Sequence, residues 1–118
     1  MSLKPLPSSL RGKERYLIFK IESDTKFGLG EVVKAVWRSF INFLGEQTVS
    51  GVNPWIMGDL FNRDKQVGAV RVSKDYVEDA RAALALTRQV NNHDVCFHVL
   101  GVTGTIESAR SKYIRAID

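Results

Sequence analysis

The stretch LGEVVKAVWRSFINFL (residues 29–44) decides the fold, because it has the clearest periodicity in the chain. Its apolar residues recur at steps of three and four over four turns: Leu29, Val32, Val33, Val36, Trp37, Phe40, Ile41 and Leu44. This spacing predicts an amphipathic helix whose wide apolar stripe, Trp37 and Phe40 included, is buried in the core. Gly45 is the expected end of this helix.

Segments with a two-residue alternation lie on both sides of this helix. Residues 16–23 predict a half-buried strand with Leu17, Phe19 and Ile21 on one face. The opposite face of that strand carries Tyr16, Ile18, Lys20 and Glu22. Residues 54–63 and 66–73 predict two more strands, joined by a polar turn at Asp64-Lys65. On the second of these, Val70 and Val72 share a face with Gly68, and Val67, Ala69 and Arg71 share the other.

The rest of the chain completes a recognisable order of elements. Ser73 is expected to cap a helix that runs to about Val90, and residues 94–102 predict a well-covered strand. A last helix is expected from about Thr105. The order β-α-β-β-α-β plus a C-terminal helix predicts an α+β fold, a ferredoxin-like or RNA-recognition-motif-like sandwich with an antiparallel sheet. Enzymes, ligand sensors and RNA-binding proteins share this fold, so it does not select a function.

Net charge is concentrated at the N-terminus. The first twenty residues hold five Lys or Arg and one Glu, equal to the whole net charge of +4 of the 118 residues. We therefore expect a basic extended arm (1–14) before a single domain (15–118), and a polyanionic partner. A solvated terminus is the alternative. With no apolar run of membrane-spanning length, no signal-peptide core and one cysteine, Cys96, the sequence predicts a cytoplasmic protein without a membrane partner.

Residue patterns for catalysis or metal binding are weak. His93 and His98 are expected on opposite faces of the last strand, and Cys96 is interpreted as a buried, inert thiol. The sequence therefore predicts no catalytic residue, no metal site and no cofactor bound by the protein. Gly28-Leu29-Gly30 opens a helix and favours either an anion site or simple turn geometry.

RNA binding is better supported, although not by base stacking. An RNA-recognition motif needs aromatic residues on its third strand, where this chain has Ala69 and Arg71. The outward apolar residues Ile18, Val67 and Ala69 are predicted to face a partner or to lie under the last helix. Basic side chains and hydroxyl groups are then expected to contact the RNA phosphates. The hydroxyls belong to the 101–105 loop, where a plain helix cap is the alternative. The predicted RNA-binding residues are Lys4, Arg11, Lys13, Arg15, Thr103, Thr105, Arg110 and Lys112.

Three blocks of sequence are more specific than these physical arguments. They are LPSSLRGKERY at 6–16, AALAL at 82–86 and VLGVTGTI at 99–106. Together and in this order they resemble ribonuclease P protein component 2, a family of archaea with eukaryotic relatives. The match extends over essentially the whole chain.

The resemblance implies a subunit of the ribonucleoprotein enzyme that removes the 5′ leader from precursor tRNA. It also implies that the ribonuclease P RNA holds Mg²⁺ and carries out catalysis, and that the partners are this RNA, precursor tRNA and protein component 3, often as a two-plus-two heterotetramer. A small-molecule sensor that dimerises through its sheet and binds a metabolite near Gly28 and Gly30 is the rival function. A module of a purely protein complex is a third.

Overall fold

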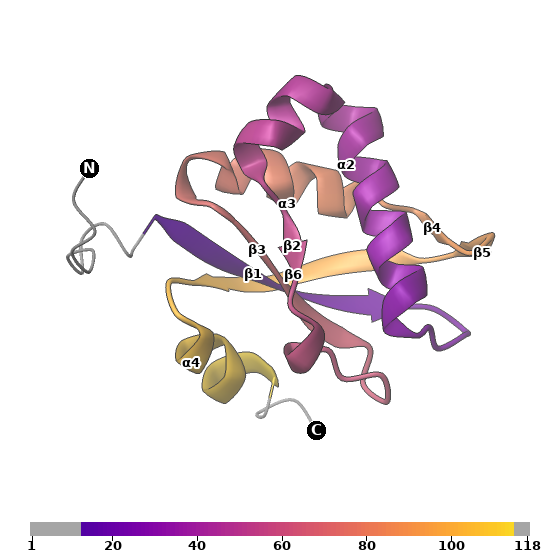
Figure 1. Cartoon of the computed structure of the whole chain (residues 1–118). Helices are drawn as coiled ribbons and strands as arrows, with labels where there is room; N and C mark the ends of the chain where they lie inside the picture. The colour runs from indigo at the N-terminus through magenta and orange to yellow at the C-terminus, as the bar shows by residue number, and fades with distance from the viewer. Residues whose placement is uncertain (1–12, 115–118) are drawn as a thin grey trace.

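A four-stranded antiparallel sheet organises the molecule. The computed structural model describes residues 13–114 of the chain, with side chains as far as residue 111. The strands lie in the order β2 (Trp55–Ile56), β3 (Val67–Ser73), β1 (Glu14–Glu22) and β6 (Cys96–Thr103). The helices α2 (Leu29–Val52) and α3 (Val77–Ala85) lie on one face of the sheet. The short helix α4 (Ile106–Ser108) and the π-helical segment η3 (Ala109–Ile114) lie on the other (Figure 1). This order confirms the predicted ferredoxin-like fold.

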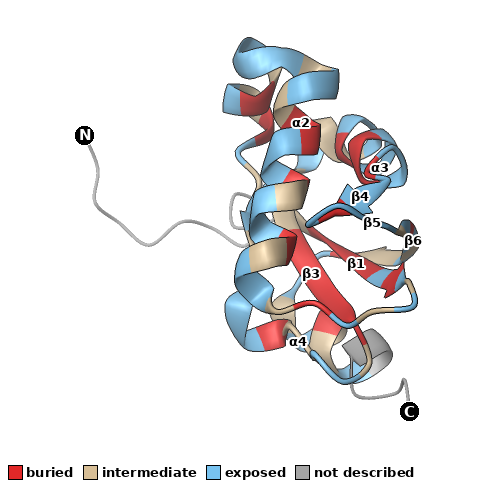
Figure 2. Cartoon of the chain, turned by 90° about the vertical axis from the view of Figure 1, so that its right-hand side faces the viewer, coloured by how far each residue is buried: buried red, intermediate tan, exposed pale blue. Residues whose placement is uncertain are grey.

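The main core lies between the sheet and the helices α2 and α3. Leu17 and Phe19 of β1 are fully buried there, and Ile21 is nearly so. Phe40 of α2 and Leu84 of α3 pack against them with no exposed surface. The buried residues line the inward faces of sheet and helices in Figure 2. Full burial of one such side chain contributes about 1.5–3 kcal/mol, so this layer is the main source of stability.

Only part of the predicted apolar stripe of α2 is buried. Val32, Val36 and Phe40 belong to the core, as expected. Leu29, Val33 and Trp37 retain 36%, 39% and 50% of their surface, so their prediction as core residues was wrong. The physical reason is geometric, because one sheet buries only a limited arc of a helix and the stripe of eight residues is wider than that arc.

Gly45 ends the first helical run of α2, as the sequence predicts. Its φ of +81° is outside the helical region, and a second helical run follows before the C-cap Asn53. Figure 1 shows the bend at which the chain turns back over the sheet. In the described part of the chain, no helix has the length and apolar character needed to cross a membrane.

Two other predicted elements are shorter than expected. The strand predicted at 54–63 is reduced to the two residues of β2, followed by the turn η1 (Gly58–Leu60). The helix predicted to reach Val90 starts with the turn η2 (Lys74–Tyr76) and ends with α3. A small hairpin of β4 (Gln89–Val90) and β5 (His93–Asp94) follows. Asn91 and Asn92 both have positive φ, at 50° and 68°, as a two-residue hairpin turn requires.

Gln66 holds two turns together at the end of the sheet where β1 finishes. Its side-chain Nε2 donates to the carbonyls of Phe27 (3.0 Å) and Arg63 (2.7 Å). Its Oε1 accepts from the Phe27 N–H at 3.0 Å. Gln66 is itself buried, with a left-handed φ of 54°. One side chain therefore fixes the 24–28 turn, and with it the start of α2.

The outward face of the sheet is covered by the chain itself over half its length. Ile18, Val67 and Ala69 have no exposed surface and pack with Tyr16, Leu60 and Ala109, with Met57 and Ile106 at the margin. Of the two coverings expected for them, the last helix is the one observed. The assignment of these three residues to a partner interface is therefore corrected, because α4, η3 and η1 already occupy that surface.

Candidate nucleic-acid interface

Four cations lie around the end of the sheet where β1 begins, with Arg15 on the face toward α2 and α3 and Arg71 on the opposite face. Sheet register pairs Arg15 with Val72, and Tyr16 with both Arg71 and Thr103. The Lys74 N–H donates to the carbonyl of Lys13 at 2.7 Å, which fixes the base of the N-terminal arm against η2. We call the cations gathered in this way the basic end of the molecule: Lys13, Arg15, Arg71 and Lys74. They lie where the described part of the chain begins, so this end of the domain presents a cationic surface.

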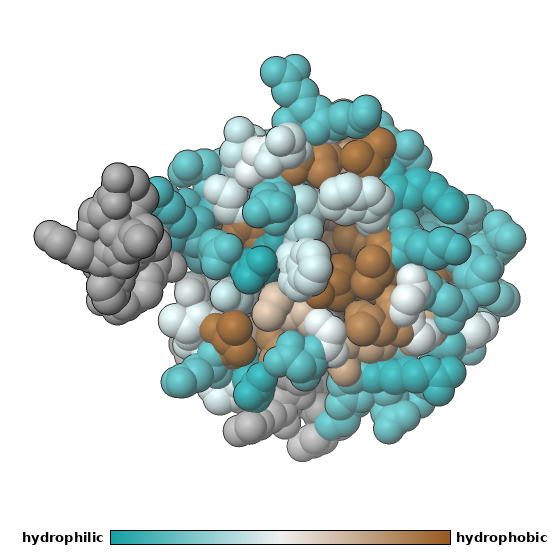
Figure 3. Space-filling model, viewed as in Figure 1, coloured by the Kyte–Doolittle hydropathy of each residue, from teal (hydrophilic) through white to brown (hydrophobic). Residues whose placement is uncertain are grey.

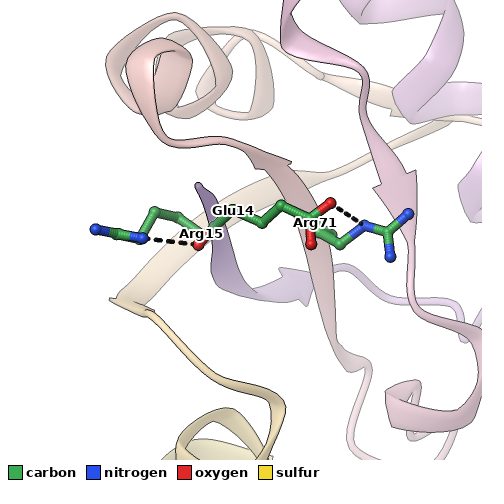
Figure 4. Close-up of polar contacts among 3 residues, drawn as sticks. All are labelled: Glu14, Arg15 and Arg71. Carbon is green, nitrogen blue, oxygen red and sulfur yellow. Dashed lines mark hydrogen bonds and ion pairs between the residues drawn. The ribbon is translucent and has the colours of Figure 1, made fainter. Parts of the chain in front are cut away.

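Weak internal contacts organise the basic end. Arg71 Nε lies 3.3 Å from Glu14 Oε2, with the side chains 33% and 45% exposed. Arg15 Nη1 donates to the backbone carbonyl of Glu14 at 2.8 Å, and Figure 4 shows Arg15 pointing away from the Glu14–Arg71 pair. An exposed ion pair of this kind contributes about 0–1 kcal/mol. Phosphates can therefore compete for these guanidinium groups at little cost to the fold.

Tyr16 adjoins the basic end but is not available for stacking on bases, because only 7% of its surface is exposed. Desolvation by burial raises the pKa of its hydroxyl above 10.0, and the Glu14 carboxylate raises the pKa further. Arg71 offsets part of this increase. The phenol is thus neutral and buried, which agrees with the prediction that this sheet does not read bases through aromatic residues.

The hydroxyls predicted to bind phosphate are used inside the chain. Thr103 is buried, and its Oγ1 donates to the carbonyl of Thr105 at 3.1 Å. Thr105 is the N-cap of α4, and its Oγ1 accepts from the Ser108 N–H at 3.1 Å. The helix-cap alternative therefore describes the 101–105 loop, and contact of Thr103 and Thr105 with RNA stays a prediction.

The predicted cations that the structure describes do not form one cluster. Arg110 of η3 is 39% exposed and pairs with Asp59 of η1 at 3.4 Å. Lys13 is exposed and Arg15 is half-buried, both at the basic end. Lys4 and Arg11 lie outside the described residues, and so does the side chain of Lys112. The sequence did not identify Lys74 as part of this site. The pairing of residue 14 with residue 73 in the sheet brings Lys74 beside Lys13.

The glycine turn before α2 is closed by the chain's own carboxylate. The Gly28 N–H donates to Glu31 Oε1 at 3.0 Å, which forms a capping box at the start of the helix. Glu31 Oε2 also accepts from Asn91 Nδ2 at 2.8 Å. A metabolite anion would have to displace Glu31, so turn geometry rather than an anion site explains these glycines. The sensor hypothesis loses both its proposed site and its open dimerisation face.

A shallow groove separates α2 from the β4–β5 hairpin. Its lining includes three cations, Lys34, Arg38 and Arg88, together with the carboxylates of Glu31 and Asp94. The opposite charges nearly balance, so this groove attracts a polyanion less strongly than the basic end.

An apolar stripe remains on the exposed side of α2. Leu29, Val33 and Trp37 follow one another at four-residue steps, and Trp55 of the edge strand β2 is 61% exposed. Trp37 lines the same hollow as Pro54, next to Trp55 in the chain. We call these four residues the α2 stripe. Figure 3 shows apolar surface gathered over α2 and the neighbouring segment that contains β2. Exposed apolar surface rimmed by polar residues is typical of protein interfaces.

One sequence interpretation fails at the other end of β6. Cys96 is exposed, not buried, because its side chain points to the outward face beyond the cover of α4. His98 shares that face, and its Nε2 lies 2.7 Å from Glu22 Oε1. The sequence predicted no metal-ligand set here, because Glu22 is distant along the chain and only sheet pairing brings it close.

Comparisons with known proteins place these features in a family. The model of the Rpp14/Pop5 family matches residues 15–114. Ribonuclease P protein component 2 of Pyrococcus horikoshii is 38% identical over 112 residues, which cover 95% of this chain and 92% of the relative. The protein of the same description from Methanocaldococcus jannaschii is 36% identical, covering 95% and 81%.

A solved structure gives an independent view of the fold. A chain in the cryo-EM structure of yeast ribonuclease MRP superposes with a TM-score of 0.63 at 10% identity, covering 79% of this chain and 75% of that one. At this identity the likeness concerns the fold alone. The family match and the archaeal relatives carry the assignment: the chain belongs to the Rpp14/Pop5 family.

Proposed function

We propose that this chain, a protein subunit of ribonuclease P, binds the ribonuclease P RNA through its N-terminal arm and basic end. The observation that carries the proposal is the placement of Lys13, Arg15, Arg71 and Lys74 around one end of the sheet, where β1 begins. Basic side chains lower the repulsion between phosphates, so RNA strands approach one another at less Mg²⁺. The protein contacts the RNA backbone and not the bases, since Tyr16 is buried.

Within this proposal the RNA holds Mg²⁺ and hydrolyses the phosphodiester, and this chain supplies no catalytic residue. The substrate is precursor tRNA, from which the 5′ leader is removed, and the site of action is the cytoplasm. Contacts come from Lys4, Arg11, Lys13 and Arg15, with Arg110 and Lys112 at the C-terminal segment. For Thr103 and Thr105 we propose a role in holding α4, which agrees with their internal hydrogen bonds.

We further propose that ribonuclease P protein component 3 docks on the α2 stripe, in a two-plus-two heterotetramer. Two observations support this surface. Trp37 and Trp55 leave half or more of their surface exposed, and large aromatic residues are the commonest anchors of protein interfaces. The apolar half of the outward sheet face is covered by α4 and η3, so it does not compete as an apolar docking surface.

Salt dependence tests the RNA contact. With about four to six phosphates contacted, the logarithm of the binding constant for ribonuclease P RNA should fall with the logarithm of salt concentration by roughly 0.7–0.9 per phosphate. Replacement of both Arg11 and Arg15 by Ala should reduce this slope by about 1.4–1.8. It should also lower leader removal at limiting Mg²⁺ in an enzyme reconstituted from RNA and protein subunits.

The matched control is Lys26→Ala with Arg63→Ala, two exposed cations at the opposite end of the sheet. This double variant removes the same charge and should bind RNA with nearly the wild-type slope. A wild-type slope near zero, or equal losses in the two double variants, would contradict a contact at the basic end.

Partner binding is tested separately on the α2 stripe. Val33→Ser with Trp37→Ser should abolish co-elution with component 3 on size exclusion, with RNA affinity unchanged. The control is Phe43→Ser, which removes an aromatic side chain that is 52% exposed on the same helix but lines the groove beside Leu86. Loss of component 3 with the control and not with the double variant would move the interface to that groove.

A further inference from the structure

Three metal-ligating side chains meet on the outward face of the sheet, at the end away from the basic end. Glu22 is the last residue of β1, and Cys96 is the first residue of β6. The strands pair so that Glu22 lies directly opposite Cys96. His98 is two residues beyond Cys96 and therefore on the same face. All three are exposed, because α4 and η3 cover only the other half of this face.

The ligand atoms are close enough to share one ion. The Cys96 thiol, the His98 imidazole and the Glu22 carboxylate each offer an atom, and all three atoms lie within 4.8 Å of one another. His98 Nε2 and Glu22 Oε1 are 2.7 Å apart. Bonds of about 2.0–2.3 Å to a tetrahedral zinc ion would separate its ligands by about 3.3–3.8 Å. The 2.7 Å pair is closer than that range and no pair is more than about 1 Å beyond it, so small side-chain rotations on two paired strands bring the ligands into position.

We propose that Glu22, Cys96 and His98 form a zinc site with three protein ligands and a fourth position open to water. Thiolate, imidazole and carboxylate are the ligands that Zn²⁺ takes in proteins, and the thiolate disfavours Mg²⁺ and Ca²⁺. The thiolate and the carboxylate together neutralise the ion. Lys20 faces His98 across the strand pair and adds one positive charge, which lowers the affinity without blocking the ligands.

Binding has a defined proton balance. Zn²⁺ takes the thiolate and the neutral imidazole, so the thiol proton, and the proton of any imidazolium, pass to solvent. Affinity should therefore fall as pH is lowered. The site lies apart from Arg15 and Arg71, and the inference does not depend on the ribonuclease P assignment. Its test needs no RNA.

The experiment uses the full chain, freed of metal and kept reduced. Titration with Zn²⁺ in a calorimeter should give one site per chain. Co²⁺, as a spectroscopic probe, should produce a thiolate-to-metal charge-transfer band in the near ultraviolet. Cys96→Ser should abolish that band. His98→Ala and Glu22→Gln should each weaken Zn²⁺ binding by more than the roughly 10–100-fold that loss of an outer-shell partner causes.

His93→Ala is the matched control, because His93 is also exposed and near this end of the sheet but lies outside the cluster. It should bind Zn²⁺ as the wild type does. Zinc should raise the melting temperature of the wild type and of His93→Ala, and leave that of Cys96→Ser unchanged. The inference is overturned if the cobalt band is absent, if Cys96→Ser binds Zn²⁺ with wild-type affinity, or if His93→Ala weakens binding as much as His98→Ala.

Discussion

Replacement of Gln66 by Met tests how much of the fold depends on one buried amide. Methionine keeps the length and volume of the side chain and the same left-handed backbone, but it loses all three hydrogen bonds. The Phe27 N–H and carbonyl then lose their partners in a residue that is only 1% exposed. Each buried unsatisfied group costs about 1–3 kcal/mol, so we expect a loss of about 2–6 kcal/mol. The carbonyl of Arg63 is on an exposed residue and can bind water instead.

Urea denaturation followed by far-ultraviolet circular dichroism measures this loss. Tryptophan fluorescence is a poor probe here, because Trp37 and Trp55 are 50% and 61% exposed in the folded chain. A loss of this size is a large share of the 5–15 kcal/mol typical of a domain, so the midpoint should move clearly. The urea dependence of the free energy of unfolding should stay the same, since the unfolded chain exposes the same surface.

Gln89→Met is the matched control, because Gln89 is exposed and makes one long side-chain contact, 3.4 Å to Asp94. Its free energy of unfolding should stay within about 0.5 kcal/mol of the wild type. If Gln66→Met costs less than about 1 kcal/mol, or no more than Gln89→Met, the two Phe27 groups find other partners and the argument from buried amides is refuted.

Four further substitutions test the sheet and the segments packed on it. Above pH 10.0 the unfolded chain releases the Tyr16 phenol proton while the folded chain retains it, so the wild-type free energy of unfolding falls with rising pH. Tyr16→Phe should remove this alkaline loss of stability. Urea midpoints that fall equally in both proteins between pH 9 and 11 would contradict this. Gly68→Ala should cost about 1–3 kcal/mol, since the new Cβ would lie 2.9 Å from a ring carbon of Phe19. Gly30→Ala, with nothing within 4 Å, should be neutral or stabilising by up to about 1 kcal/mol in the same urea assay. Ala109→Asp should lower the free energy of unfolding by about 3 kcal/mol, because it places a carboxylate against the outward apolar face. Binding of a hydrophobic dye should increase. A folded variant of wild-type stability would show that α4 does not cover that face.

The spacing of apolar residues predicted helices and strands well where burial alone determines which positions are apolar. Alternation in 16–23 identified both faces of β1, and the three- and four-residue steps identified α2. Leu29, Val33 and Trp37 were misplaced because an apolar side chain looks the same in sequence whether it is buried or exposed. Asn91 and Asn92 were read as a helix end, but their tolerance of positive φ makes a hairpin turn.

The candidate sites were harder to predict, because strand pairing brings their residues together from distant positions in the sequence. Lys74 joins the basic end through the backbone of Lys13, some sixty positions earlier in the chain. Glu22 meets Cys96 and His98 only when β1 pairs with β6. Thr103 and Thr105 show the reverse case, since a motif with phosphate-binding composition satisfies its own backbone. The basic arm stays a prediction from charge composition, because residues 1–12 lie outside the described part of the chain.

The shift in register between β1 and β6 affects how readily the edge of this sheet pairs with another chain. β6 is an outer strand of eight residues, long enough to template the pairing of another chain. The register shifts between Ile18 and Phe19, which breaks the even run of pairing opposite Leu100. Such a bulge bends the strand and strengthens its twist, so the backbone groups of its free side no longer form a flat row. β2, at the opposite margin, is only two residues long. Both margins are thus poor seeds for strand-by-strand aggregation.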